Sequence, residues 1–289
     1  MAEPAHHPVL VEEVVALLRE ADVVIDLTVG AGGHARALLE AGVGRVVGVD
    51  RDPGAVDAAS ALLAGYGARF RARRAPFSEV AEVAGAEGAR EVGGVLYDLG
   101  VSSVHLDRPE RGFSYRIEGP LDMRMDPSGP TAADVVNGYP QENLERVIGE
   151  LGEERFAGRI SRAIVRARSR RPLQTTRELA AVVAAAVPRR RGGPHPARRT
   201  FQAIRIEVNR ELEELGASLP QAAQLLAPGG RLVAIAYHSL EDRIVKRFLR
   251  DDERLDVLTK KPVRPSQAAI GRNPRARSAK LRAGQRRAA

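Results

Sequence analysis

The feature that most constrains this chain is a glycine cluster between two apolar runs, VVIDLTVGAGGHARALLEAGVGRVVGVDRD at residues 23–52. The β-branched run at 23–29 predicts a strand, and GGHARALLEAG after it predicts a helix. The second run, RVVGVD at 45–50, predicts another strand. A strand, a glycine turn, a helix and a strand in this order form one βαβ unit, so the two strands are expected to be parallel.

The alternation of strand and helix continues along the next fifty residues. We expect a helix at 52–67, because Asp52 is suited to cap it and Pro53 to its first turn. Further strands are expected at 69–75 and 93–100. This order predicts an α/β fold with a mostly parallel, doubly wound sheet.

The pattern changes after residue 107 to a proline-rich loop followed by helices. Helical periodicity is found at 144–168, 176–187 and 200–215. The third helix would carry on one face Phe201, Ile204, Val208, Leu212 and Leu215.

The α/β pattern then returns at 228–250, as a turn, a strand and an amphipathic helix. We therefore expect a core made of residues 1–107 and 206–289, with a helical domain at 108–205 inserted into it. No internal repeat is apparent.

The glycine turn admits three interpretations: an ordinary tight turn, a dinucleotide site, or a site for S-adenosylmethionine. Asp50 ends the second strand, where a carboxylate can accept both ribose hydroxyls of an adenosine. Asp26, just before the glycines, would repel a pyrophosphate but could pair with the ammonium group of the methyl donor. Asp98 ends the fourth strand, at the edge where open α/β sheets bind ligands. Together with the late strand introduced by PGG at 228–230, these acids favour the methyl donor.

Composition narrows the chemistry further. The chain has no cysteine, which excludes disulfides, thiolate metal sites and cysteine nucleophiles, and disfavours methylation at cytosine C5. It has no apolar run long enough to span a membrane and no signal-peptide pattern, so we expect a cytoplasmic protein. Its net charge is +8, with arginine far more common than lysine, which suits contacts with phosphate but also fits a codon bias.

The basic residues gather in three segments. The first segment is a helix face that carries Arg155, Arg159, Arg162 and Arg166. The second is a loop at 189–200 with five arginines. The third is the last thirty residues, which hold ten cations and no acid. Such clusters are expected to contact RNA phosphates, although the helix face could equally be a solvated surface. Candidates for stacking on bases are Phe113, Tyr115 and Tyr139.

At several stretches the sequence resembles the bacterial 16S ribosomal RNA cytosine-N4 methyltransferase family. The most specific are RGFSYRIEGPLDMRMD at 111–126, HPARRTFQAIRIEVNRELEEL at 195–215 and PGGRLVAIAYHSLEDRIVKRF at 228–248. The resemblance implies a Rossmann-like class I methyltransferase core with a helical insert, S-adenosylmethionine as methyl donor and the small ribosomal subunit or its RNA as partner. The donor contacts it implies are Gly32, Gly33, His34, Asp50, Phe77, Asp98 and His105.

The sequence departs from the family pattern at a few of these positions. Leu27 replaces a usual glycine, and Ala35 replaces a usual serine. Val104 and His105 stand where a Pro-Gln pair is common in the family. None of these changes removes a charged group that the donor needs.

Two residues are candidates for catalysis. Methylation of an exocyclic amine needs an acceptor that orients the N–H bonds and in-line positioning of the methyl group, with no covalent intermediate. Asp98 is the first candidate, and a carboxylate that only caps a turn is the alternative. His238 could contact the base or move a proton, or could serve structure alone. No histidine spacing suggests a metal site, so none is expected.

Other functions remain open on the sequence alone. The same fold could methylate an amine of another RNA or of DNA, or the chain could be a non-catalytic RNA-binding assembly factor. The sequence does not say whether naked RNA or an assembled subunit is the substrate. The alanine-rich insert leaves a homodimer open.

Overall fold

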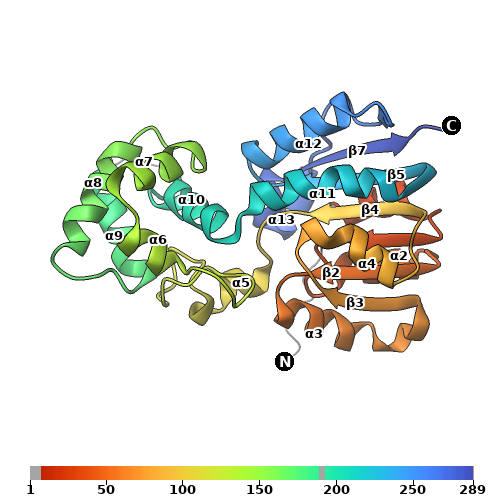
Figure 1. Cartoon of the computed structure of the whole chain (residues 1–289), viewed down its shortest axis with the longest axis horizontal. Coiled ribbons are helices and arrows are strands. Elements are labelled where there is room, and N and C mark those ends of the chain that lie inside the picture. The colour runs from red at the N-terminus through yellow and green to blue at the C-terminus, as the bar shows by residue number, and fades with distance from the viewer. Residues whose placement is uncertain (1–7, 189–192, 289) are drawn as a thin grey trace. The chain divides into compact units, whose positions relative to one another are not determined.

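A computed structural model describes residues 8–188 and 193–288 (Figure 1). His6, His7 and the arginines at 189–191 lie outside the described residues. The chain divides into two compact units, one joining Met1–Gly100 to Leu212–Ala289 and the other formed by Val101–Glu211. The second unit interrupts the first, and its ends lie a few residues outside the 108–205 insert expected from the sequence.

The first unit is built on a seven-stranded sheet with the order β3-β2-β1-β4-β5-β7-β6. The first five strands in this order are parallel, and β7 is antiparallel to both of its neighbours. The strands are β1 Val23–Asp26, β2 Arg45–Asp50, β3 Phe70–Arg74, β4 Val92–Asp98, β5 Leu226–Ala236, β6 Leu255–Val257 and β7 Lys280–Arg286. The mostly parallel, doubly wound sheet is confirmed, and its strand order reverses between β1 and β4.

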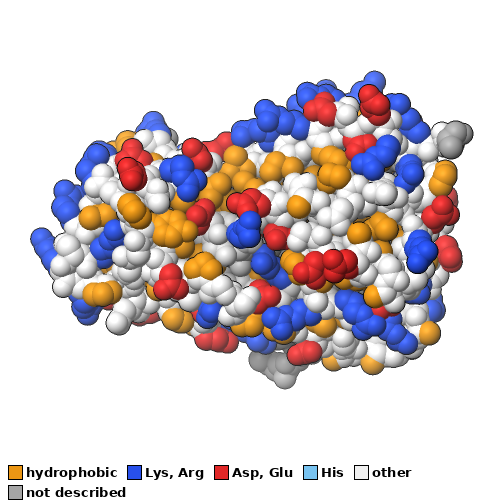
Figure 2. All heavy atoms as spheres, viewed as in Figure 1, with side chains coloured by type: hydrophobic (Ala, Val, Ile, Leu, Met, Phe, Trp, Pro, Cys, Tyr) orange, Lys and Arg blue, Asp and Glu red, His pale blue; other side chains and the backbone are white. Residues whose placement is uncertain are grey.

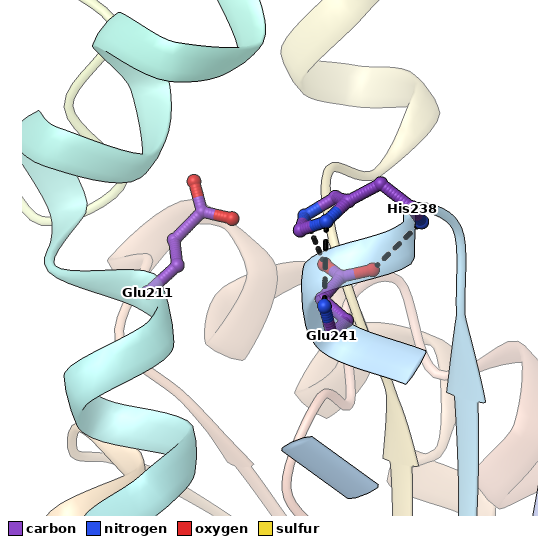
Figure 3. A group of neighbouring side chains, drawn as sticks. All are labelled: Glu211, His238 and Glu241. Carbon is purple, nitrogen blue, oxygen red and sulfur yellow. Dashed lines mark hydrogen bonds and ion pairs between the residues drawn. The ribbon is translucent and has the colours of Figure 1, made fainter. Parts of the chain in front are cut away.

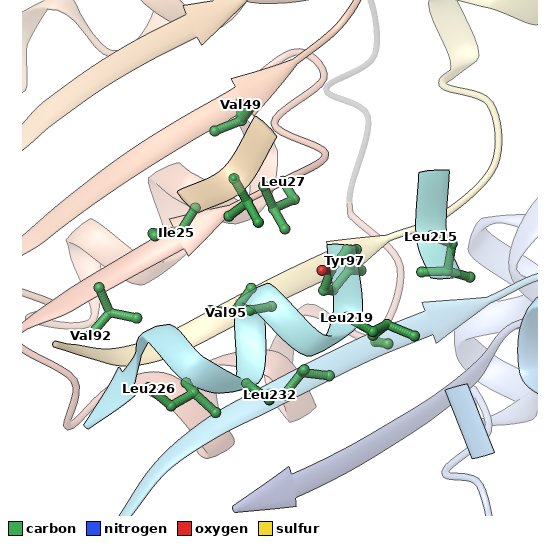
Figure 4. Packing of buried hydrophobic residues seen from close by; sticks show 14 of the residues in the cluster. Ile25, Leu27, Val49, Val92, Val95, Tyr97, Leu215, Leu219, Leu226 and Leu232 are labelled. Atoms are coloured by element: carbon green, nitrogen blue, oxygen red, sulfur yellow. The ribbon is translucent and has the colours of Figure 1, made fainter. Parts of the chain in front are cut away.

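Helices cover both faces of this sheet because side chains alternate along its buried strands. Val24 packs on one side with α1, α2 and α3, whereas Ile25 packs on the other with α4, α11 and α12. Figure 4 shows the second core, where Leu215 and Leu219 of α11 meet Tyr97 and Leu232 of the sheet. These helices are α1 Val11–Leu18, α2 Gly33–Glu40, α3 Pro53–Leu62, α4 Val80–Ala86, α11 Glu211–Leu225 and α12 Ser239–Asp251.

The C-terminal segment differs from the basic RNA-contacting tail that the sequence suggested. Residues 280–286 form β7, which lies between β5 and β6. Lys280 and Arg282 lie 3.0 Å and 2.6 Å from the carboxylate oxygens of Asp242, and Arg286 donates to backbone carbonyls near the end of α11. Three of the tail cations therefore tie β7 to α12 and to the end of α11. The sequence KLRAGQR alternates basic and apolar residues at its start, which is typical of a strand. The prediction of an RNA-contacting tail counted only the basic residues and missed this pattern.

The second unit is helical and has its own apolar core. Its helices are α5 Ser103–Asp107, α6 Ala132–Gly138, α7 Gln141–Glu150, α8 Ala157–Arg168, α9 Thr176–Ala186 and α10 Arg198–Asn209. The predicted helix at 176–187 is confirmed. Shorter elements of the whole chain are α13 Gln267–Arg272 and the 3-10 segments Ala64–Arg69, Phe77–Glu79, Pro109–Arg111 and Pro274–Ser278.

Two predicted helices are each broken in the structure. The 144–168 pattern forms α7 and α8, separated by a turn in which Glu153 has a φ of 47°. The 200–215 pattern ends at Arg210, whose φ of 50° and ψ of 36° are left-handed, and α11 begins at the next residue. Phe201, Ile204 and Val208 consequently enter the core of the insert, whereas Leu215 enters the core of the sheet unit.

The packing of β2 predicts opposite effects for two Gly→Ala substitutions. A Cβ on Gly48 would lie 2.6 Å from Cγ2 of Val29 and 3.2 Å from Cε2 of Phe70, whereas one on the exposed helical Gly85 meets nothing within 4 Å. We expect Gly48→Ala to lower the free energy of unfolding by about 1–3 kcal/mol. Gly85→Ala should raise it by up to about 1 kcal/mol. Urea unfolding measures both, and equal effects would contradict the packing at Gly48.

Candidate functional site

Three carboxylates gather at the carboxyl ends of adjacent parallel strands. Asp26 ends β1, Asp50 ends β2 and Asp98 ends β4, and β1 pairs with both other strands. The charges of Asp50 and Asp98 both act on Asp26. This edge, at the point where strand order reverses, is where open α/β sheets bind ligands.

Asp26 is fully buried. Its Oδ1 accepts a hydrogen bond from the backbone N–H of Thr28 at 3.1 Å, while its Oδ2 is buried with no hydrogen-bond partner among the described residues. Burial raises the pKa of this carboxyl to about 6, against the lowering effects of His34 and Thr28. A buried oxygen without a donor is a costly arrangement that a cationic or N–H-bearing ligand would relieve.

The glycine turn is tied to Asp50. Oδ2 of Asp50 accepts from the backbone N–H of Gly30 at 3.0 Å, and its Oδ1 accepts from that of Asp52, also at 3.0 Å. The carboxylate therefore joins the turn after β1 to the start of α3 and sits between them.

Packing around the turn leaves little room for a side chain at Gly32 or Gly33, which the sequence alone did not show. Gly32 has a φ of 86°, and a Cβ there would lie 3.2 Å from Cδ1 of Leu63. A Cβ on Gly33 would lie 2.7 Å from Cγ of Pro8. Both positions are restricted by packing of the protein itself, so the glycines alone do not identify a ligand.

Asp98 is held from two sides. Nε2 of the buried His34, on α2, lies 3.3 Å from its Oδ2, and the hydroxyl of Tyr237 donates to its Oδ1 at 2.7 Å. The backbone N–H of Asp98 also donates to the Thr28 hydroxyl at 2.6 Å. The carboxylate is thus fixed in place, with 22% of its side-chain surface exposed.

Burial and the Asp98 charge shift the pKa values of both partners. Burial lowers the pKa of His34, but its pairing with Asp98 and the charge of Asp26 outweigh this and leave the pKa above its usual value. Burial and the Asp98 charge together place the pKa of Tyr237 well above its usual value. Tyr237 therefore acts as a hydrogen-bond donor at neutral pH.

Sequence reasoning missed Tyr237. It directly follows β5, which pairs with β4 so that Ile235 lies opposite Asp98. Its position just beyond the strand end was the signal, because the carboxyl ends of neighbouring parallel strands meet at one edge.

Phe77 follows β3, beyond the same edge of the sheet. Its ring meets that of Tyr97 edge-on, with centroids 5.8 Å apart. The Tyr97 hydroxyl is buried and donates to Oγ of Ser218 on α11. Phe77 remains partly exposed, so it offers an apolar ring beside Tyr97, the residue before Asp98.

His238 caps α12 (Figure 3). Its Nδ1 accepts from the backbone N–H of Glu241 at 3.4 Å, and its Nε2 lies 3.0 Å from Oε1 of the same residue. The other carboxylate oxygen of Glu241 accepts from the backbone N–H groups of Tyr237 and His238. This arrangement holds the chain between β5 and α12, immediately after Tyr237.

His105 belongs to the insert unit rather than to the sheet unit that holds the other candidates. Its Nδ1 accepts from the backbone N–H of Ser102 at 3.2 Å, at the start of α5. Its ring packs on Phe113, with centroids 4.9 Å apart. Within its own unit, His105 therefore serves a capping and packing role.

Comparison with known proteins gives consistent matches along the whole chain. The sequence model of the MraW methylase family matches residues 3–287. A ribosomal RNA small subunit methyltransferase H from Acidothermus cellulolyticus is 48% identical over 307 residues, which cover 97% of this chain and 93% of that protein. The corresponding protein of Carboxydothermus hydrogenoformans is 47% identical over 306 residues and covers 98% of both chains.

The buried Asp26 predicts a specific pH dependence of stability. Because its pKa is about 6 in the folded chain and 3.8 ordinarily, the folded state holds this proton more tightly, and stability falls as pH rises between these values. At pH 7, Asp26→Asn should raise the free energy of unfolding by about 3 kcal/mol. Below pH 4 the two proteins should unfold alike, and denaturant titrations at both pH values test this. A less stable variant at pH 7 would contradict the assignment.

Proposed function

Since this chain belongs to the MraW methylase family, we propose that it transfers a methyl group from S-adenosylmethionine to the N4 amine of a cytidine in 16S ribosomal RNA. The matching relatives are named as ribosomal RNA small subunit methyltransferases and align over nearly their full length.

The observation that carries the proposal is the set of three carboxylates around the glycine turn. A dinucleotide would bring a pyrophosphate to this turn, and the negative charge of Asp26, just before the glycines, would repel it. S-adenosylmethionine has no phosphate and carries a sulfonium and an ammonium group. The residues present fit this donor: Asp26 has an unpartnered buried oxygen for the ammonium group, and Asp50 ends β2 where a ribose is bound in such folds.

The remaining donor contacts are proposed on the same basis. Phe77 supplies an apolar ring against Tyr97, the residue before Asp98, and His34 holds the carboxylate of Asp98. Gly32 and Gly33 shape the turn from which the backbone faces the donor. The contact of His105, which lies in the insert unit, stays a prediction from the family resemblance.

Asp98 is the proposed catalytic residue. The bound donor supplies a methyl group on a sulfonium, which accepts the S–C bonding pair as the new N–C bond forms. A carboxylate oxygen of Asp98 would accept a hydrogen bond from the target amine, which turns the nitrogen lone pair out of the ring plane and toward the methyl group. The same oxygen would take up the proton that the methylated nitrogen loses. Tyr237 and His34 keep the carboxylate in position.

Exposed arginines on the insert are the proposed contacts to RNA phosphates. Arg159, Arg162 and Arg166 lie on α8 and are exposed, while Arg155 lies just before the helix with its guanidinium over the ring of Phe156. Figure 2 shows that Lys and Arg side chains on the visible face are interspersed with acidic ones. Such contacts give affinity and salt dependence rather than choice of base.

The setting of the reaction is proposed from the substrate. We propose a cytoplasmic setting, because a ribosomal RNA substrate would be met there. In the described part of the chain no helix has the length and apolar character needed to cross a membrane. The homodimer that the sequence leaves open would be tested by light scattering of the purified protein.

Methylation of the small subunit tests the proposed function. Subunits from a strain lacking this activity should gain N4-methylcytidine, measured by mass spectrometry of digested RNA, when incubated with the protein and S-adenosylmethionine. Asp98→Asn should lower kcat by about 10²–10⁴-fold. RNA binding should stay within about threefold of the wild type. A fully active Asp98→Asn variant would remove this residue from the mechanism, and wild-type protein that binds RNA without methylating it would favour an assembly factor.

His238→Asn separates capping from catalysis. Asparagine is a favoured helix cap, so this variant keeps the start of α12 while removing the imidazole. Because the ring is engaged with Glu241, we expect kcat to stay within about threefold of the wild-type value and the melting temperature to change little. The predicted catalytic role of His238 would instead require a loss of about 100-fold at unchanged stability.

A further inference from the structure

The insert unit carries a stack of aromatic rings that ends at an exposed histidine. The rings of Tyr115 and His195 are nearly parallel, 16° apart, with centroids separated by 4.8 Å. Phe201 is buried beneath and meets Tyr115 edge-on, with centroids 5.8 Å apart. The order of increasing exposure is therefore Phe201, Tyr115, His195.

The orientation of the His195 ring is fixed by the local backbone. The Nδ1 atom of His195 accepts a hydrogen bond from the backbone N–H of Ala197 at 3.2 Å. The backbone carbonyl of His195 accepts one from the backbone N–H of Arg198 at 3.0 Å. Because Nδ1 is an acceptor, the neutral ring carries its proton on Nε2. The His195 ring is therefore already held in one orientation in the free protein, before any ligand binds.

The other two aromatic residues that the sequence suggested for base stacking make contacts within the protein instead. Phe113 is buried against His105 in the insert core, and the Tyr139 hydroxyl donates to Glu207 at 2.9 Å. Of those three, Tyr115 alone takes part in a stack that reaches an exposed ring.

Positive charge flanks this stack. The guanidinium of Arg116 lies 5.7 Å from the centroid of the Tyr115 ring, and Arg198 is exposed in the first turn of α10. Neither makes an ion pair within the described residues. Aromatic rings beside unpaired cations are the combination that binds single-stranded nucleic acid, with bases on the rings and phosphates on the cations.

We propose that His195, backed by Tyr115, is a stacking platform for an unpaired base of the RNA substrate, with Arg116 and Arg198 contacting the flanking phosphates. The proposal rests on the RNA substrate proposed above and adds the subsite that receives a base. Stacking is tolerant of base identity, so the platform contributes affinity and register rather than sequence choice.

The chain contains no tryptophan, which allows a direct test. His195→Trp introduces a single indole at the platform, whereas Asn143→Trp introduces one at an exposed, uncharged position on α7. Each variant is titrated with an oligocytidylate of about twelve nucleotides and with an abasic strand of equal phosphate count. We expect saturable quenching of the His195→Trp fluorescence by oligocytidylate and little quenching by the abasic strand or in Asn143→Trp. Equal quenching in both variants, or by both strands, would overturn the proposal.

Kinetics supply a second test that does not depend on the tryptophan variant. His195→Ala should raise the KM for RNA by about 5- to 100-fold, with the KM for the donor unchanged. His195→Phe, which keeps a flat ring, should restore most of the loss. An unchanged KM for RNA in His195→Ala, with wild-type methylation intact, would refute the platform and leave the proposed function standing. Failure of the wild type to methylate would refute that function instead.

Discussion

Parallel pairing of β1 with both β2 and β4 is the constraint on which the candidate site depends. It aligns the carboxyl ends of three strands, and each strand ends in an aspartate. Apolar side chains on both faces of the sheet fix this register, because a slip by one residue would turn the buried face of a strand outward. The positions of the carboxylates are therefore set by the two hydrophobic cores rather than by the site itself.

Bringing three carboxylates together is unfavourable for the free protein. Asp26 is buried, feels the charges of both other aspartates, and keeps one oxygen without a donor among the described residues. Backbone N–H groups of Thr28, Gly30 and Asp52 donate to the carboxylates of Asp26 and Asp50 and offset part of this repulsion. His34 and Tyr237 do the same at Asp98. The clustered carboxylates therefore lower the stability of the free protein, and binding of a cationic ligand would restore it.

The sequence predicted the fold where local pattern and tertiary structure agree. The strand at 45–50 and the helix at 176–187 were recognisable because periodicity, caps and glycine turns point the same way. The breaks at Glu153 and Arg210 were not, since a left-handed arginine or glutamate leaves no signal in hydrophobic periodicity. Asp26, Asp50 and Asp98 were found from strand ends, whereas Tyr237 and the stack at His195 depend on contacts between distant segments that no local pattern encodes.

The placement of β7 has a consequence for synthesis of the chain. Because β7 lies between β5 and β6 but follows both in the chain, the middle of that half of the sheet is completed only by residues 280–286. Until they emerge, β5 presents an unpaired edge and β6 has no neighbour, while the insert can already fold around its own core. Exposed strand edges are templates for aggregation, so the nascent protein is most vulnerable after β6 has been synthesised and before β7 follows it.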